Sequence, residues 1–164
     1  MMRVFAVSGF SGTGKTSLVE ALVRELVKSG HTVATIKSSK HEPGPDRGTD
    51  TWKHTQAGAS TTLFLRTNET SRGLRARIGK ENLAMLAGHD YLIIEGMKSV
   101  DIPRFWCVGV NDIVSDEIPL NTQAIVSWSQ RTATNQEYTV IGADRVQELV
   151  EIVKERALHM SSIE

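Results

Sequence analysis

The sequence of 164 residues has little of three things: cysteine, net charge and long apolar runs. Cys107 is the only cysteine, which excludes an internal disulfide and a metal site made of several cysteines. The 19 Lys and Arg residues balance the 19 Asp and Glu residues, so no overall field attracts nucleic acid or an anionic membrane. No segment approaches the ~18 apolar residues needed to span a bilayer. Any anion that binds this chain must therefore be held by a local site.

The composition fits one domain with a real core. Hydrophobic residues make up 40% of the chain, and we expect residues 1–164 to form a single domain. Cys107 lies in the apolar run Phe105–Val108 and is expected in the core. The short apolar start, residues 1–8, runs directly into a glycine-rich segment, which favours a first strand over a signal peptide. We therefore expect a cytoplasmic protein.

Strands and helices are predicted to alternate along the chain. A helix is indicated over Lys15–Ser29, where apolar residues recur on one face before Gly30. It lies between an apolar strand, Arg3–Val7, and a β-branched strand, Thr32–Ile36. This alternation predicts an α/β fold of three layers, with a mostly parallel central sheet covered by helices on both faces. The other predicted strands are Thr61–Leu65, Leu74–Ile78, Tyr91–Ile94, Arg104–Val110, Ala124–Trp128 and Tyr138–Ile141, and the other helices are Asp50–Ala57, Glu81–Ala87 and Asp144–Leu158.

The segment Gly9–Thr16 matches the phosphate-binding loop pattern G-x-x-x-x-G-K-[ST] at every fixed position. Its glycines let successive N–H groups point at phosphate oxygens, and the following helix directs its positive end to the same place. Lys15 can reach the outer phosphates and Thr16 can ligate Mg²⁺. A chance match is expected in about 1% of chains of this length. We predict a P-loop NTPase fold that binds a nucleoside triphosphate and Mg²⁺ through Gly9, Ser11, Gly12, Thr13, Gly14, Lys15, Thr16 and Ser17.

Two acids flank the buried strand Tyr91–Ile94, and topology distinguishes them. Ligands of a parallel sheet bind at the carboxyl ends of its strands, which places Glu95 on the side of the phosphate loop and Asp90 at the opposite rim. We predict that Glu95 holds Mg²⁺ or orients water beside Thr16, so that Lys15 and Glu95 are the candidate catalytic residues. The alternatives are a solvated loop acid for Glu95 and a strand-entry cap for Asp90.

The polar segment Ser38–Thr49 leaves the carboxyl end of the second strand and faces the same site. We assign Lys37, at its start, to nucleotide binding. Asp50, at its end, either completes the Mg²⁺ shell with Thr16 and Glu95 or caps its own helix.

The remaining charged side chains offer weaker candidates. His41 is expected at the surface, and His54 on the solvent side of its helix. Since we find no histidine or glutamine base beside Glu95 and no arginine finger, turnover should be slow. Three arginines fit either a phosphate-clamping lid or a solvated strand face: Arg72, Arg75 and Arg77.

Three stretches resemble the molybdopterin-guanine dinucleotide biosynthesis adaptor proteins, the MobB family. The first, Ser8–Thr16, is shared with many nucleotide-binding families. The second, Thr35–Ala59, is similar to that family's "IKH…D…GKDSW…AGA" segment and is more specific. The third, Leu92–Lys98, is similar to its "VEGFK". Together they span roughly residues 3–110.

The resemblance implies a GTP-binding protein with weak Mg²⁺-dependent GTPase activity that acts as a dimer in molybdenum cofactor biosynthesis. It would assist the guanylyltransferase that attaches GMP to molybdopterin, and molybdopterin itself is a further candidate partner. The family's phosphate and Mg²⁺ roles carry over to Lys15, Thr16, Asp50 and Glu95. Three positions depart from the family's pattern: Ser38, Lys40 and Thr49.

Two other functions remain open on the residues alone: a small-molecule kinase that uses ATP, and a nucleotide-dependent regulatory switch. The switch proteins often carry an early loop lysine where this chain has Phe10. The sequence contains no Asn-Lys-x-Asp motif for reading guanine, so guanine specificity depends on the resemblance. The loop after Ala124–Trp128, with Ser127 and Ser129, is our candidate for base contact.

Overall fold

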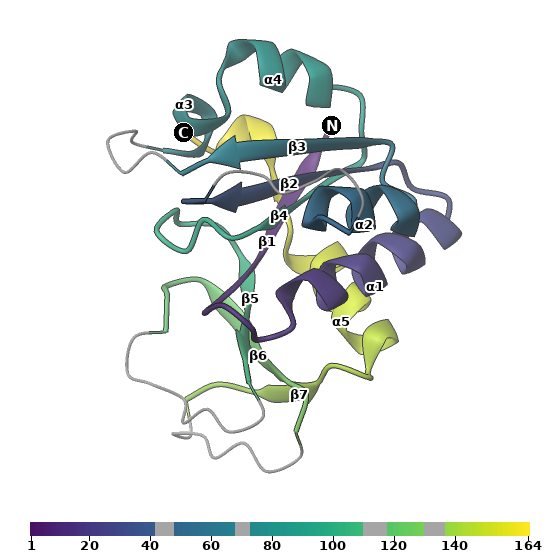
Figure 1. Cartoon of the computed structure of the whole chain (residues 1–164), viewed down its shortest axis with the longest axis vertical. Helices are drawn as coiled ribbons and strands as arrows, with labels where there is room; N and C mark the ends of the chain where they lie inside the picture. The colour runs from purple at the N-terminus through teal and green to yellow at the C-terminus, as the bar shows by residue number, and fades with distance from the viewer. Residues whose placement is uncertain (42–47, 68–72, 110–117, 130–136) are drawn as a thin grey trace.

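A single eight-stranded sheet organises the described part of the chain, residues 1–41, 48–67, 73–109, 118–129 and 137–164 of a computed structural model (Figure 1). The strand order is β3-β2-β4-β1-β5-β6-β7, and every neighbouring pair along it is parallel. The strands are β1 (Arg3–Gly9), β2 (Val33–Ser39), β3 (Thr61–Arg66), β4 (Tyr91–Glu95), β5 (Arg104–Val108), β6 (Thr122–Ser127), β7 (Val140–Gly142) and β8 (Leu158–His159).

Helices cover both faces of this sheet (Figure 1). The helices are α1 (Lys15–Lys28), α2 (Asp50–Ala57), α3 (Leu74–Ile78), α4 (Lys80–Leu86) and α5 (Val146–Arg156), followed by a 3₁₀ turn, η1 (Met160–Ser162). Buried residues of α1, α2 and α5 share one core cluster, and those of α3, α4 and η1 share another on the opposite face. The predicted three-layer α/β arrangement is confirmed.

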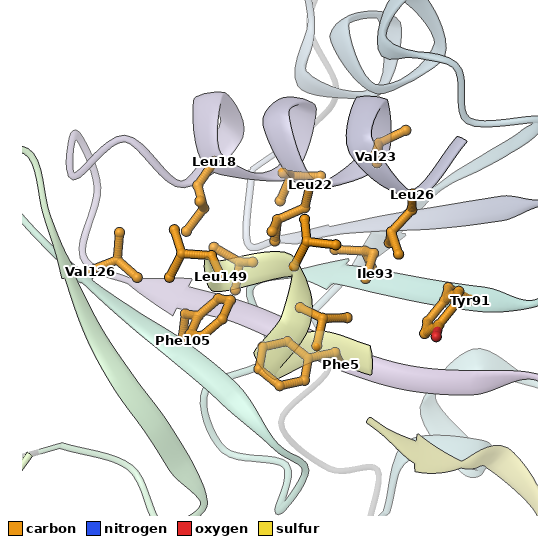
Figure 2. Close-up of a cluster of buried hydrophobic side chains, with 14 of the residues drawn as sticks. Phe5, Leu18, Leu22, Val23, Leu26, Tyr91, Ile93, Phe105, Val126 and Leu149 are labelled. Carbon is orange, nitrogen blue, oxygen red and sulfur yellow. The ribbon is translucent and has the colours of Figure 1, made fainter. Parts of the chain in front are cut away.

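The larger core lies between α1, α5 and the sheet (Figure 2). Leu18, Leu22 and Leu26 recur every four residues on α1 and are fully buried, as the apolar periodicity predicts. Against them stand Phe5 of β1 and Phe105 of β5, whose rings meet edge to face at 4.7 Å. Each such burial contributes about 1.5–3 kcal/mol to folding. This packing fixes α1 on the sheet, and with it the loop that precedes α1.

One predicted strand is a helix. Leu74–Ile78 forms the single helical turn α3, bounded by Gly73 and Gly79 at φ of 72° and 81°. Its two buried side chains, Leu74 and Ile78, are four residues apart, a spacing that suits a strand and a helix equally because four is a multiple of two. The flanking glycines adopt positive φ, which other residues avoid, and so the chain turns at both ends of a single helical turn and does not continue as a strand.

The C-terminal segment also differs from its prediction. The closing helix ends at Arg156, and Leu158–His159 forms β8, antiparallel to β1. The carbonyl of Glu164 then accepts hydrogen bonds from the backbone N–H groups of Leu74 and Arg75, at 3.0 and 3.3 Å. The end of the chain therefore joins β1 to α3.

The strand register places the site residues side by side. Glu95 at the end of β4 pairs with Val7 of β1 on one side and Lys37 of β2 on the other. Cys107 is buried as expected. None of the helices in the described ranges is long and apolar enough to cross a membrane.

Candidate phosphate-binding site

The phosphate-binding loop (P-loop), Gly9–Thr16, joins the end of β1 to the start of α1, as predicted. Gly12 and Gly14 adopt φ of 75° and 84°, the region that favours glycine. Thr13 Oγ1 donates a hydrogen bond to the carbonyl of Phe10 at 2.7 Å and closes the turn. Each predicted phosphate-binding residue lies in this loop or in the first turn of α1: Gly9, Ser11, Gly12, Thr13, Gly14, Lys15, Thr16 and Ser17.

The ammonium of Lys15 lies over the P-loop. Its Nζ donates to the carbonyls of Gly9 and Phe10, at 2.8 and 2.9 Å. Burial, and next the positive charge of Lys37, lowers the pKa of Lys15. A nearby anion would relieve both effects, because it supplies negative charge to a partly desolvated ammonium.

Trp128, directly after β6, packs on the P-loop from the other side. Its indole Nε1 donates to the carbonyl of Thr13 at 3.1 Å, and a Cβ on Gly14 would collide with its ring. The neighbouring serines form their own turn, in which Ser127 Oγ donates to the carbonyl of Ser129 at 2.7 Å. We did not predict a contact between Trp128 and the P-loop, although the position of Trp128 at the carboxyl end of a parallel strand indicates one.

Glu95 lies beside the P-loop, where topology places it. Thr16 Oγ1 donates to Glu95 Oε1 at 2.7 Å. Asp90, at the start of the same strand, accepts a hydrogen bond from the backbone N–H of Thr32 at 2.8 Å. Asp90 therefore has the strand-entry role named as its alternative, and the predicted proximity of Glu95 to Thr16 is found.

Lys37 joins two carboxylates at this site. Its Nζ lies 2.8 Å from Glu95 Oε1 and 2.8 Å from Asp50 Oδ2. Burial would lower the pKa of Lys37, but the charge of Glu95 and the hydrogen bonds to Asp50 and Glu95 raise it above its ordinary value. The N-cap alternative for Asp50 is wrong, because Thr49 Oγ1 accepts the capping bond from the backbone N–H of Trp52 at 3.2 Å.

His54 lies behind Glu95 and is fully buried, so its prediction on the solvent side of α2 is wrong. Its Nε2 lies 2.8 Å from Glu95 Oε2, and its Nδ1 lies 2.9 Å from Thr35 Oγ1. We predicted no histidine base beside Glu95, and the structure places a histidine there. Since both ring nitrogens have partners in the protein, His54 is placed to position Glu95. Ala57, three residues further along α2, is also buried, so His54 and Ala57 lie on the same face of the helix, towards the core.

These partners determine the charge of Glu95, whose exposed fraction is 1%. Burial alone would raise the pKa of Glu95, but the hydrogen bond with His54, the charge of Lys37 and the hydrogen bonds from Lys37 and Thr16 lower it to about 2. The carboxylate is therefore ionised throughout the physiological range and is available as an oxygen ligand or hydrogen-bond acceptor.

We expect a pH dependence of stability that belongs to Glu95. Its folded-state pKa, about 2, lies below the ordinary value of 4.5, so ionised Glu95 stabilises the fold above about pH 4.5. This stabilisation is lost progressively as the pH falls from 4.5 towards 2. In denaturant unfolding at pH 3–7, the free-energy difference between wild type and Glu95→Gln should be constant above pH 5 and shrink below it. A difference independent of pH would contradict the assignment.

The remaining candidates lie further out. His41 is exposed, as expected. Arg75 and Arg77 belong to α3, so a strand face is wrong for them, and Arg75 Nη1 donates to the carbonyl of Met160 at 3.3 Å. Arg72 lies outside the described residues, as does Val110 at the end of the predicted strand Arg104–Val110.

The oxygens around Lys37 suit Mg²⁺ chemically. Mg²⁺ prefers hard oxygen ligands, and in phosphate-transfer sites it is bound by one or two carboxylates together with phosphates and waters. Thr16 and Glu95 supply a hydroxyl and a carboxylate in contact, with Asp50 on the far side of Lys37. Among the described residues, no three His, Cys, Asp or Glu side chains gather as metal ligands.

Residues 4–127 match the protein family described as Molybdopterin guanine dinucleotide synthesis protein B, MobB. The chain belongs to the MobB family. A Methanocaldococcus jannaschii protein described as a biosynthesis adapter for molybdopterin-guanine dinucleotide is 35% identical over 111 residues, which are 63% of this chain and 46% of that protein. The corresponding adapter protein of Haemophilus influenzae is 31% identical over 109 residues, 62% of this chain and 60% of that protein. The chain thus spans about half to three fifths of these curated relatives.

Solved structures show the same fold. Bacillus subtilis MobB superposes with a TM-score of 0.60 at 22% identity, covering 94% of this chain and 98% of that chain. The hydrogenase maturation factor HypB from Archaeoglobus fulgidus superposes with a TM-score of 0.64 at 15% identity, covering 94% and 89%. The predicted P-loop NTPase fold is therefore confirmed.

Proposed function

We propose that this member of the MobB family binds a nucleoside triphosphate with Mg²⁺ and hydrolyses it slowly. The observation that carries this proposal is the hydrogen bond between Thr16 and Glu95, which brings a carboxylate to the mouth of a complete P-loop. In P-loop NTPases the loop's Ser or Thr holds Mg²⁺, and a carboxylate on a neighbouring strand completes the arrangement. Such a metal ion, when bound, neutralises charge on the phosphates.

The other residues divide the binding task. The backbone of Gly9–Thr16 receives the phosphates, and Lys15 turns from its loop carbonyls to a phosphate oxygen. Lys37, now paired with Glu95 and Asp50, would donate to a phosphate oxygen, and these two carboxylates would hold Mg²⁺. With Mg²⁺ bound, the charges of Glu95 and Asp50 would be balanced by the metal ion, as Lys37 balances them in its absence.

We further propose that the nucleotide is GTP and that the protein acts as an adaptor in molybdopterin guanine dinucleotide synthesis. The names of the M. jannaschii and H. influenzae relatives support the adaptor role. Its partner would be the guanylyltransferase that joins GMP to molybdopterin, and the active form a homodimer. The loop after β6, now with Trp128 beside Ser127 and Ser129, remains our candidate for base contact.

A calorimetric titration with GTP, ATP and their diphosphates, each with and without Mg²⁺, tests this proposal. GTP binding that Mg²⁺ strengthens is expected, together with a turnover number well below ~1 s⁻¹ for the protein alone. Tighter binding of ATP would overturn the guanine assignment. Rapid turnover would instead favour the small-molecule kinase.

We predict opposite outcomes for the two acids of β4. Glu95→Gln should abolish most of the gain in triphosphate affinity that Mg²⁺ provides, because an amide replaces the charged ligand beside Thr16. Asp90→Asn should leave that gain unchanged, since Asp90 is bonded to Thr32 at the other rim of the sheet. The proposal fails if Asp90→Asn is the substitution that removes the Mg²⁺ dependence in the same titration.

A further inference from the structure

A cavity of about 610 Å³ opens beside the P-loop. Its walls come from the end of β1 and the start of the P-loop, the end of β2 with the residues after it, and the loop that follows β4, together with Thr67 and Arg77. The cavity touches Gly9, Phe10 and Ser11 at the start of the loop, together with Lys15. Gly12–Gly14 and Thr16 are not among its described lining residues. The cavity therefore extends from the loop's outer end towards β2 and β3, away from Trp128.

The charged side chains of the described walls are mainly cationic. These walls carry the side chains of Lys15, Lys37, Lys40, Arg77 and Lys98, and no aspartate or glutamate. Around these cations stand the hydroxyls of five serines and Thr67. Ammonium and guanidinium groups mixed with hydroxyl donors form charge-assisted hydrogen bonds with phosphate oxygens. The walls thus favour an anion with several acceptor oxygens.

Phe10 adds a flat apolar surface to this charged cavity. Phe10 occupies a position that the P-loop motif leaves free, and although it is a large apolar residue, its exposed fraction is 49%. Its ring rests edge to face on the buried Trp106, with 5.5 Å between centroids, and Lys98 Nζ lies 5.1 Å from its centroid. Met97 stands beside these residues in the wall. An aromatic ring held in place beneath an ammonium can stack against a planar ligand while the ammonium meets its charge.

We propose that this cavity binds a second ligand, a phosphate monoester carried on a flat ring, next to the outer phosphate of the nucleotide. Its phosphate lies among Lys40, Arg77 and Lys98, and its ring packs on Phe10 and Met97. That the two ligands are neighbours rests on the proposed nucleotide binding, because Lys15 and Gly9–Ser11 belong to both sites. The preference of the cavity itself follows from its walls alone.

The test uses 1-naphthyl phosphate as probe, with the full chain and ligand-observed NMR to measure its affinity. Wild type should bind the probe both alone and when saturated with Mg²⁺ and a non-hydrolysable GTP analogue. 1-Naphthol, which lacks the phosphate, should bind at least tenfold more weakly. Lys98→Ala should weaken probe binding roughly five- to tenfold and leave affinity for the GTP analogue unchanged. Lys28→Ala, the same substitution at the end of α1, is the matched control and should change neither affinity.

Three results would overturn the inference: an equal effect of Lys98→Ala and Lys28→Ala, equal binding of naphthol and naphthyl phosphate, or complete displacement of the probe by the GTP analogue. The last would mean that the probe had occupied the P-loop. The two proposals can fail separately. If the GTP analogue does not bind but the probe binds in a Lys98-dependent manner, the nucleotide proposal falls and the cavity assignment stands.

Discussion

Lys15→Ala should reduce the affinity for nucleoside triphosphate at least about 100-fold and leave the fold intact. In the described part of the structure, the ammonium of Lys15 donates hydrogen bonds only to the carbonyls of Gly9 and Phe10, in its own loop. The hydrophobic core therefore does not depend on Lys15. Hydrogen bonds from a charged donor are worth about 1.5–3 kcal/mol each, and an ammonium can make more than one to adjacent phosphates. Calorimetric titration with GTP and Mg²⁺ measures the loss.

Lys28→Ala provides the control for this prediction as well. Lys28 is exposed at the opposite end of α1, so the variant should bind triphosphate as wild type does. The melting temperatures of both variants should lie within a few degrees of wild type. Unchanged affinity in Lys15→Ala would rule out the phosphate-loop assignment, and a collapsed melting temperature would mean that Lys15 serves the fold instead.

The position of the P-loop could be predicted because its motif consists of consecutive residues. Gly12, Gly14 and Lys15 need only their neighbours to form a phosphate cradle, and the same is true of the periodic apolar face of α1. Glu95 required one further step, the rule that parallel strands present their carboxyl ends on one side of the sheet. That rule is general, so a single sequence was enough to separate Glu95 from Asp90.

The partners of Glu95 could not be predicted in the same way. His54 meets Glu95 across 41 positions of sequence, and Trp128 meets the P-loop across 115. Such contacts depend on how a helix is rotated over the sheet or which strand ends beside the loop. A histidine on a polar helix such as α2 is most simply placed towards water, because the short helix shows no strong apolar stripe. The buried position follows only from the tertiary contact with Glu95.

The predictions for the short elements α3 and β8 were wrong for a related reason. In α3 the two buried residues satisfy both helical and strand spacing, and in β8 only two residues pair with β1. Neither segment carries enough periodicity to determine its own conformation. Contacts elsewhere decide it: Glu164 bonds to the start of α3, and Met160 N donates to the carbonyl of Met2 beside β1.

His54→Ala should destabilise the protein by about 3 kcal/mol, a large share of the total for a domain of this size. The substitution leaves Glu95 Oε2 and Thr35 Oγ1 buried without their partner and opens a space beneath α2. Removing the hydrogen-bond partner of a buried carboxylate is costly because the carboxylate keeps its charge away from water. Denaturant unfolding measures the loss, and His41→Ala, at an exposed position, should change stability by less than about 0.5 kcal/mol.

A double-mutant cycle with Glu95→Gln separates this charge effect from the lost packing. Glutamine has no charge that the loss of His54 could leave buried without a partner. His54→Ala should therefore lower the free energy of unfolding by at least about 1 kcal/mol less in the Glu95→Gln background than in wild type. The lost bond to Thr35 and the space beneath α2 are common to both backgrounds and cancel in the comparison. If the cost is the same in both, His54 fills space in the core and does not hold the carboxylate. A reduced cost shows instead that His54 stabilises ionised Glu95, the state in which it can serve Thr16 and Mg²⁺.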